Sequence, residues 1–465
     1  MQKIFDEVQS LDKKACEKFF LSEDILMEHA ASSIFRYIKK RFKIKTSVLI
    51  LCGCGNNGAD GLALGRLLHK LYDVKINLVN NPKSQMAILQ EKRAKSLNIE
   101  FVDSIFEADI IVDCIFGTGL NKKIDKKIIE LIDKVNSFKS FKIACDIPSG
   151  IEKNGRIKQT AFKADTTITM GTFKTALFSD IAKDFVGKLK VANLGLPKED
   201  YEDEANIFLL EKSDMKLPFR NKKDSHKGSF GHVNVILGEK KGAAIIASNA
   251  AFYFGAGLVS LITKEKAKIL NNIPNHIMSS EKVSKNCTAI AIGMGLGEYK
   301  KEELKTILDI KAKKVIDADL FYNEIILAYL DERVVLTPHP KEFISLLKLT
   351  KIADITIEEL QENRFLYVKQ FCQKYKEVVL LLKGTNVLIS KDEKIFVNTY
   401  GSSILSKGGS GDVLSGLIAS LLAQGYETLD AAITASLAHT LAANNYKKNN
   451  YSFGPQDLIE EIKKI

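Results

Sequence analysis

Short apolar runs alternate with longer amphipathic stretches along nearly the whole chain, and this alternation restricts the fold more than any other feature. In the first half, strands are predicted at 46–53, 74–80, 109–117, 141–146, 166–171 and 189–195, and helices at 58–72, 84–98 and 125–136. Strands that alternate with helices at this spacing form a mostly parallel sheet covered on both faces. The pattern therefore predicts an α/β fold.

A polar, charge-rich segment from about 197 to 228 separates this pattern from a second one of the same kind. Beyond it, strands are predicted at 231–238, 257–263, 289–297, 313–319, 333–340 and 377–390, followed by a glycine-rich loop and helices. A chain of 465 residues is long enough for two domains of ordinary size. We therefore expect two α/β domains, residues 1–212 and 213–465.

The formal net charge of +11 raises the question of a nucleic-acid partner. The lysines are interleaved with acidic residues, and no arginine-rich arm or aromatic-basic motif accompanies them, so we expect no nucleic-acid partner. The uncharged run at 243–263 has about the length of a bilayer span. It contains polar residues and glycines, so a buried helix followed by a strand explains it better, and we expect no membrane segment.

The seven cysteines are odd in number, lie in apolar contexts and form no C-x-x-C pair. This distribution fits neither a disulfide scaffold nor a zinc site. The N-terminus also lacks the apolar region of a signal peptide. We therefore expect a reducing, cytoplasmic location.

Three motifs of the first half follow predicted strands, where parallel sheets place their ligand sites. They are CGCGNNGADG at 52–61, DCIFGTGL at 113–120 and DIPSG at 146–150. Each alone could be a tight turn, but together they bring Asp60, Asp113 and Asp146 to one rim. This combination suits a ribose-phosphate ligand with a cation nearby, and oxygen ligands without His or Cys favour a hard, monovalent cation. The spacing GNNGADG differs from GxGxxG and from the P-loop, which disfavours a hydride-transferring dehydrogenase.

In the second half, KGGSGDVLSG at 407–416 places three glycines and a serine around Asp412, before a helix-like run. Asp412 could simply cap the helix, but a cap does not require Gly408, Gly409 and Gly411 together. Glycines before a helix let backbone N–H groups converge on an anion, whereas an Asp among them would repel a static phosphate. The pairing favours catalysis, in which Asp412 takes a proton from a hydroxyl and the N–H groups hold a transferred group.

Three more segments follow strands in this half. GMGLG occurs at 293–297, and TPHPKE at 337–342 fixes His339 between two prolines, either as a structural turn or as a rigidly presented imidazole. KGT at 383–385 places an ammonium and a hydroxyl at a strand end, as a nucleotide phosphate or ribose would require.

Together these motifs resemble a known family. GNNGADGL, VDCIFGTGL and DIPSG resemble the N-terminal epimerase domain of the bifunctional NAD(P)H-hydrate repair enzymes. GHVNVILG, GMGLG, TPHPKE, KGTNV and GGSGDVLSG resemble their C-terminal ADP-dependent dehydratase domain. The resemblance implies a Rossmann-like first domain and a ribokinase-like second domain, each a three-layer α/β/α structure.

The activity implied by the resemblance is repair of NADHX and NADPHX, the hydrated forms of the reduced nicotinamide cofactors. The first domain would interconvert the R and S epimers. The second would dehydrate the S form to NAD(P)H as ADP becomes AMP and phosphate. The implied partners are these small molecules, and we also expect a homo-oligomer.

The resemblance implies roles for particular residues. In the first domain the hydrate would be held by Asn56, Asn57, Gly58, Ala59, Asp60, Gly117, Thr118, Gly119, Leu120, Asn121, Lys122, Lys123 and Asp146. Asp60 and Asp146 would be catalytic, and K⁺ would be bound by Asn57, Asp113 and Ser149. In the second domain Ala243, Gly295, His339 and Asp412 would contact the hydrate, with Asp412 as the base. The adenine nucleotide, with Mg²⁺ beside it, would be contacted by Lys383, Gly384, Thr385, Asn386, Val387, Gly409, Ser410 and Gly411.

Two other functions fit part of the sequence. A ribokinase-like small-molecule kinase would use the same glycine-rich loop and Asp412, but it needs no second nucleotide-like site. A non-catalytic nucleotide sensor is disfavoured because Asp60, Asp146, His339 and Asp412 are all present. Ala59, Lys341 and Lys407 depart from the family pattern, but none of these departures removes a reactive group.

Overall fold

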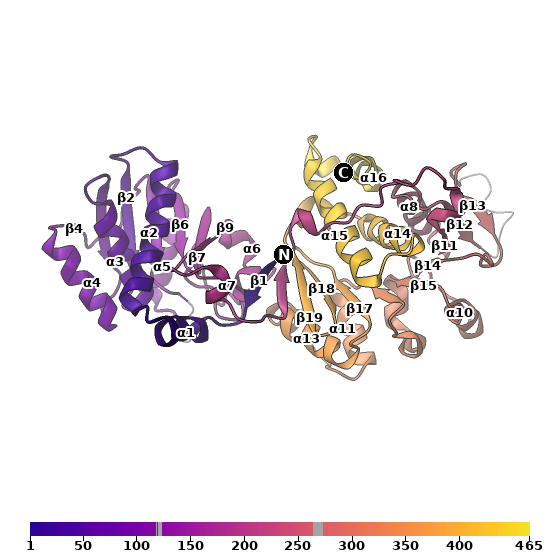
Figure 1. The fold of residues 1–465 in the computed structure, drawn as a ribbon, viewed down its shortest axis with the longest axis horizontal. Helices are drawn as coiled ribbons and strands as arrows, with labels where there is room; N and C mark the ends of the chain where they lie inside the picture. Colours follow the sequence, from indigo (N-terminus) through magenta and orange to yellow (C-terminus); the bar gives the residue numbers. More distant parts are fainter. Residues whose placement is uncertain (118, 120–122, 264–272) are drawn as a thin grey trace. The chain divides into compact units, whose positions relative to one another are not determined.

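A computed structural model of the chain describes residues 1–117, 119, 123–263 and 273–465 (Figure 1). The chain divides into two compact units. One contains Lys3–Ala205, and the other contains Asn206–Ile465 together with Met1–Gln2. Both units have α/β architecture, which confirms the predicted fold class. The domain boundary after residue 212 stays a prediction.

The first unit is built on a seven-stranded parallel sheet with strand order β4-β3-β2-β5-β6-β7-β9. The strands are β2 (Ser47–Cys52), β3 (Asp73–Leu78), β4 (Glu100–Phe101), β5 (Ile110–Cys114), β6 (Phe141–Cys145), β7 (Thr166–Met170) and β9 (Lys188–Ala192). From β2 the chain runs outward to β4 and then crosses to β5, so the strand order reverses between β2 and β5. Such a switch point opens a crevice at the carboxyl ends of the strands.

Helices cover both faces of this sheet (Figure 1). They are α2 (Glu23–Arg41), α3 (Asn56–Leu68) and α4 (Gln85–Ser96) on one face and α5 (Lys126–Ser137) on the other. Successive side chains of a strand point to opposite faces, and here Ile50 packs under α2, α3 and α4 while Leu49 and Leu51 pack under α5. The apolar run of β2 is therefore explained by burial on both sides.

Shorter elements complete the first unit. They are α1 (Gln9–Phe19), α6 (Lys183–Val186), α7 (Lys198–Tyr201), β1 (Gln2–Phe5) and β8 (Phe173–Lys174). Strand β1 pairs in parallel with β8 through Ile4 and Phe173. This pairing places Lys174 just beyond the end of β7, which becomes important for the site.

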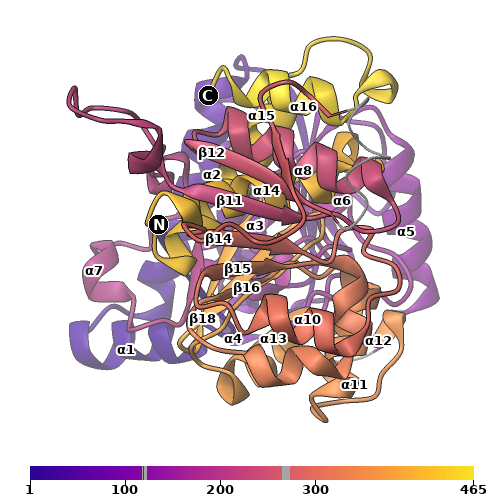
Figure 2. The ribbon, with the colours of Figure 1, turned by 90° about the vertical axis from the view of Figure 1, so that its right-hand side faces the viewer.

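The sheet of the second unit runs β13-β12-β11-β14-β15-β16-β17-β18-β19-β10, and Figure 2 shows β12, β11, β14, β15 and β16 side by side. The strands are β10 (Ile207–Leu209), β11 (His232–Ile236), β12 (Leu258–Ile262), β13 (Met278–Ser280), β14 (Ala289–Ile292), β15 (Lys313–Ile316), β16 (Val334–Leu336), β17 (Val379–Leu382), β18 (Val387–Lys391) and β19 (Lys394–Asn398). Strand β18 is antiparallel to both of its neighbours. The strand predicted at 377–390 is thus a hairpin, whose turn at 383–386 holds the KGTN segment.

Helices cover both faces of the sheet of the second unit as well. They are α8 (Lys241–Tyr253), α10 (Lys301–Leu308), α11 (Pro340–Leu349), α12 (Ile357–Glu362), α13 (Arg364–Lys374), α14 (Ser410–Ala423), α15 (Thr428–Asn445) and α16 (Pro455–Ile462). Val379 and Leu381 join one core with α8, α14 and α15, whereas α13 packs on the same strand without joining that core. Helix α14 is almost entirely buried, which explains its uninterrupted apolar sequence. No helix in the described residues combines the length and apolar character needed to cross a bilayer.

Candidate active sites

The first site lies at the carboxyl ends of β2, β5 and β6, and two glycines set its geometry. A Cβ on Gly58 would lie 1.9 Å from the carbonyl oxygen of Gly53, and one on Gly53 would lie 1.9 Å from that of Ile115. Only glycine permits so close an approach. As a result α3 begins at Asn56, immediately beyond β2 and against the loop that follows β5.

Side chains from all three motifs meet at this rim. A Cβ on Gly117 would lie 3.2 Å from Oδ2 of Asp146 and 3.6 Å from the Cβ of Asn57. Asn56 and Lys123 are exposed, whereas Ala59 is buried in the core under α3. Four predicted residues lie outside the described ones: Thr118, Leu120, Asn121 and Lys122.

Asp113 and Ser149, two of the predicted K⁺ ligands, contact each other directly. The buried carboxylate of Asp113 accepts hydrogen bonds from the backbone N of Ser149 at 2.7 Å and from its Oγ at 2.6 Å. It also accepts one from the N–H of Ile115 at 3.1 Å. Burial raises the pKa of Asp113 to about 6, although these hydrogen bonds oppose the shift.

Asn57, the third predicted K⁺ ligand, has a side-chain amide that is unpaired among the described residues. Both atoms of its amide are buried and have no hydrogen-bond partner within the described part of the chain. Buried polar side-chain atoms are nearly always paired, so an orphaned amide requires an explanation.

Asp146 has a partner that the sequence analysis did not anticipate. The Nζ of Lys174 lies 2.6 Å from Oδ1 of Asp146 and also donates to Oγ1 of Thr169 and the carbonyl of Met170, at 2.9 Å each. Lys174 is only 2% exposed. The only sequence signal was a lysine inside the otherwise apolar segment TFKTALF.

Asp60 lies beside this ion pair and is partly buried. Burial raises its pKa well above the usual range, and the charges of Asp146 and Asp12 raise it further. Asp12 comes from α1 and accepts a hydrogen bond from the hydroxyl of Tyr201 at 2.8 Å. Its own pKa is raised by burial. The sequence analysis identified neither Asp12 nor Tyr201, because they lie far from the motifs along the chain.

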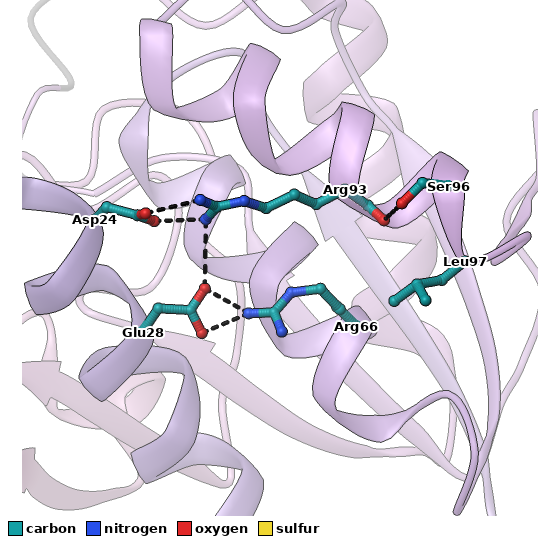
Figure 3. A pocket seen from close by; sticks show the side chains of 6 residues that line it. All are labelled: Asp24, Glu28, Arg66, Arg93, Ser96 and Leu97. Atoms are coloured by element: carbon teal, nitrogen blue, oxygen red, sulfur yellow. Dashed lines mark hydrogen bonds and ion pairs between the residues drawn. The ribbon is translucent and has the colours of Figure 1, made fainter.

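A separate hollow of about 490 Å³ lies against α2, α3 and α4 (Figure 3). It is lined by Asp24, Glu28, Arg66, Arg93, Ser96 and Leu97. Arg93 binds both carboxylate oxygens of Asp24, at 2.6 and 2.8 Å, and Arg66 pairs with Glu28. Since its charges are mutually paired and none of the predicted residues lines it, this hollow is not the predicted site.

The second site is built around the start of α14. Gly409 precedes the helix with φ 93°, and a Cβ there would lie 2.4 Å from Cγ of Pro455. Asp412 stands in the first turn of α14. A Cβ on Gly411 would lie 3.4 Å from Nζ of Lys383, so the ammonium borders the glycine-rich turn. Burial raises the pKa of Asp412 to about 6, the charge of Asp317 adds to the shift, and Lys383 opposes it.

Lys383 links two carboxylates below this turn. Its Nζ lies 2.9 Å from Oδ1 of Asp317 and 3.8 Å from Oε2 of Glu342. Burial lowers the pKa of Lys383, but these two charges outweigh burial, and the net effect raises the pKa. The other oxygen of Asp317 accepts a hydrogen bond from Oγ of Ser415 on α14 at 2.7 Å. Asp317 was not a predicted site residue, although an acid directly after β15 was a usable signal.

His339 caps α11 and also faces this group of charges. Its Nδ1 accepts a hydrogen bond from the backbone N of Glu342 at 3.3 Å, and its Nε2 lies 3.1 Å from Oε1 of Glu342. Burial, together with Lys383, lowers the pKa of His339, and burial raises the pKa of Glu342 to about 7. The side chain of His339 is still 45% exposed. The turn is therefore structural and also presents the imidazole.

The other predicted residues of this domain lie at the start of α8, after β14 and in the β17–β18 hairpin. A Cβ on Gly295 would lie 3.4 Å from the Cβ of Ala243, and one on Gly409 would lie 3.2 Å from Cδ1 of Ile246, so the start of α8 adjoins both. Gly384, Thr385, Asn386 and Val387 form the β17–β18 turn and the start of β18.

Two buried side chains that the sequence analysis missed bind the backbone of the predicted nucleotide residues. Arg364 donates to the carbonyl of Asn386 at 3.0 Å and to that of Lys383 at 3.2 Å. Nε2 of His439 lies 2.9 Å from the carbonyl of Ser410. Burial lowers the pKa of His439 to about 4, so the neutral ring donates this bond and fixes the turn.

Comparison with known proteins assigns both halves of the chain. A family model described as NAD(P)H-hydrate dehydratase matches residues 233–464, and one described as YjeF-related protein N-terminus matches residues 23–176. A curated relative from Helicobacter pylori, named bifunctional NAD(P)H-hydrate repair enzyme Nnr, is 44% identical over 472 residues and is matched over 100% of both chains.

Two solved structures resemble the second unit. A ribokinase-like superfamily protein from Enterococcus faecalis is 24% identical, with a TM-score of 0.47, over 57% of this chain and 96% of its own. An ADP/ATP-dependent NAD(P)H-hydrate dehydratase from Bacillus subtilis, crystallised with ATP/Mg²⁺, is 24% identical, with a TM-score of 0.44, over 53% of this chain and 92% of its own.

Proposed function

This chain belongs to the family of bifunctional NAD(P)H-hydrate repair enzymes, and we propose from that membership how its two sites restore hydrated NADH and NADPH. The first domain interconverts the R and S epimers of the hydrates. The second domain dehydrates the S epimer to the reduced cofactor while ADP becomes AMP and phosphate. Together the two reactions recover both epimers.

The approach of Lys383 to the glycine-rich turn that holds Asp412 carries the proposal for the second domain. Asp412 takes the proton of the substrate hydroxyl as this oxygen attacks the terminal phosphoryl group of ADP. Backbone N–H groups at the start of α14 and the ammonium of Lys383 hold the charge of the moving group. The phosphorylated oxygen then leaves as phosphate, expelled by the ring nitrogen, and loss of a proton from the adjacent carbon forms the double bond. Mg²⁺ would enter with the nucleotide phosphates.

The first domain contains buried side-chain oxygen atoms that suit K⁺. The orphaned amide of Asn57 provides an oxygen without a hydrogen-bond donor, and Ser149 and Asp113 provide hydroxyl and carboxylate oxygens nearby in the fold. These hard ligands suit an alkali cation. When bound, K⁺ would balance the buried charge of Asp113 and attract the phosphates of the substrate.

We expect K⁺ to stabilise the protein and activate epimerisation at constant ionic strength. Choline chloride provides the K⁺-free reference, and a cation at 100 times its Kd adds about 2.7 kcal/mol to the free energy of unfolding. Thermal melts and epimerisation rates across a KCl series measure both effects. Asn57→Ala should remove the K⁺-specific part, and an undiminished K⁺ response in this variant contradicts the assignment.

The main test follows NADH absorbance while the full chain acts on mixed R- and S-NADHX with K⁺, with and without ADP. We expect ADP-dependent recovery to proceed beyond the S fraction, faster than uncatalysed epimerisation allows. A stable phosphorylated product without NADH would instead indicate a kinase.

We propose a cellular location and an oligomeric state for the protein. All seven cysteines lie in the described residues and are free thiols there, which supports a reducing, cytoplasmic location. We also propose a homo-oligomer, which light scattering of the purified protein tests directly.

A further inference from the structure

The first site contains two carboxyl groups in opposite electrostatic settings. Asp146 faces the ammonium of Lys174 at 2.6 Å, and this lysine donates its remaining hydrogen bonds to Thr169 and Met170 at 2.9 Å. Asp146 also accepts from the N–H of Met170 at 3.1 Å. Its charge is thus balanced by a fixed, buried cation.

Asp60, in contrast to Asp146, contacts an uncharged thiol. Its carboxyl accepts a hydrogen bond from the thiol of Cys145, whose Sγ lies 3.9 Å from Oδ2. The thiols of Cys52 and Cys114 border the same helix turn at Gly61, and neither carries a charge to offset an ionised Asp60. Burial and the charge of Asp146 both raise the pKa of Asp60 well above its usual range, which favours its protonated form.

The backbone of Asp146 adopts a strained conformation. Its φ is 70°, in the left-handed region that side chains other than Gly, Asn and Asp rarely adopt. The hydrogen bonds from Met170 and Lys174 hold the carboxylate in this conformation. Such strain concentrates at functional sites, where the surrounding structure fixes the geometry.

We propose that Asp60 is the proton donor and Asp146 the proton acceptor of epimerisation, and that Lys174 is the positioning residue whose ion pair holds the carboxylate of Asp146 in place. This inference rests on the proposed epimerase function and deepens it. The charged and titratable groups that face the pair are Asp12 of α1, Lys174 of β8, Tyr201 of α7 and the thiols of Cys52, Cys114 and Cys145.

The step inverts one carbon without oxidation. The proton of Asp60 moves to the hydroxyl oxygen of the hydrate, the carbon–oxygen bond breaks as the ring nitrogen forms a carbon–nitrogen double bond, and water leaves. A water molecule adds to the opposite face of that carbon, and its extra proton moves to Asp146. Proton exchange through solvent then restores both carboxyl groups, and the reverse reaction exchanges their roles.

The pH dependence of epimerisation in the full chain tests this division of roles. We expect kcat/KM to fall on the basic side of the profile as Asp60 loses its proton. In Lys174→Met the rate should fall through kcat more than through KM, because Asp146 loses the contact that orients it while the substrate-binding residues stay in place. Lys174→Arg should recover part of kcat, and Asp60→Asn should abolish the basic limb.

Controls separate charge from folding. The exposed Lys188 of the same domain provides a matched lysine, and Lys188→Met should leave kcat, KM and the pH profile unchanged. If Lys174→Met does not fold by circular dichroism, Lys174→Met with Asp146→Asn removes both charges and should fold with no epimerase activity. A folded Lys174→Met with the kcat of wild type overturns the positioning role, and so does an active double variant. Absence of epimerisation in wild type, while S-NADHX is still dehydrated, refutes the proposed epimerase function itself.

Discussion

Asp412→Asn should lower ADP-dependent recovery of NADH by about 10²–10⁴, because a general base contributes roughly that factor. The variant should nevertheless be at least as stable as wild type near neutral pH. The pKa of Asp412 is raised to about 6 by burial and by Asp317, so folding disfavours its ionised form above that pH, and an amide avoids this cost. Loss of activity with retained stability is typical of a residue kept for function.

NADH absorbance and a thermal melt of the same preparation measure both parts of this prediction. Asp430→Asn is the matched control, because Asp430 also lies in the first turn of a helix of this unit, and there it pairs with Lys216 at 2.9 Å on the surface. The control should retain activity. Epimerisation should continue in Asp412→Asn, since its site lies in the other unit. Asp412→Asn that still dehydrates S-NADHX at the wild-type rate would exclude Asp412 as the base.

Lys383→Met should have the second large effect, lowering the stability of the protein and changing the pH dependence of dehydration. The loss of the ammonium leaves Asp317 and Glu342 without their shared counter-charge, and breaking a buried ion pair costs about 3–5 kcal/mol. It also removes the charge that lowers the pKa of Asp412. Dehydration requires ionised Asp412, so its rate falls as the pH drops through about 6 in wild type, and in the variant this limb should move to higher pH.

A profile of kcat/KM for ADP against pH tests this second prediction, and a denaturant titration gives the stability change. Lys383→Met with Asp317→Asn should recover part of the stability but not the nucleotide affinity. Lys376→Met is the control, because this exposed lysine pairs with Glu393 away from the predicted nucleotide residues. An acid limb that does not move in Lys383→Met would mean that Lys383 exerts no electrostatic effect on Asp412.

The candidate residues were found from sequence wherever a motif follows a strand directly. GNNGADG and DIPSG combine glycines with an acid at the end of an apolar run, whereas GGSGD does so at the start of one. The structure brings Asn57, Gly117 and Asp146 together at one rim. In the second unit it likewise places Lys383 beside the turn of Gly411. Such short-range patterns are readable because close backbone approach demands glycine at particular positions.

The hairpin of β17 and β18 was not predicted from the sequence. The run at 377–390 is apolar on both sides of KGTN, and the sequence analysis treated it as one strand. Burial of both strands hides the turn, since neither an alternating pattern nor a proline interrupts the apolar residues. Arg364, which fixes this turn, lies on α13 and has no motif of its own.

The sequence by itself determined the α/β class and the positions of the glycine-rich turns, because strand and helix periodicity and glycine geometry are local properties. The family was recognised from the resemblance of its motifs. Only the tertiary structure decided which groups balance the charges at each site. Lys174 meets Asp146, Asp317 meets Lys383 and His439 meets Ser410. These pairs join elements that strand order and helix packing bring together, and a pKa depends on the sum of burial and charge from all of them. No local pattern encodes that sum.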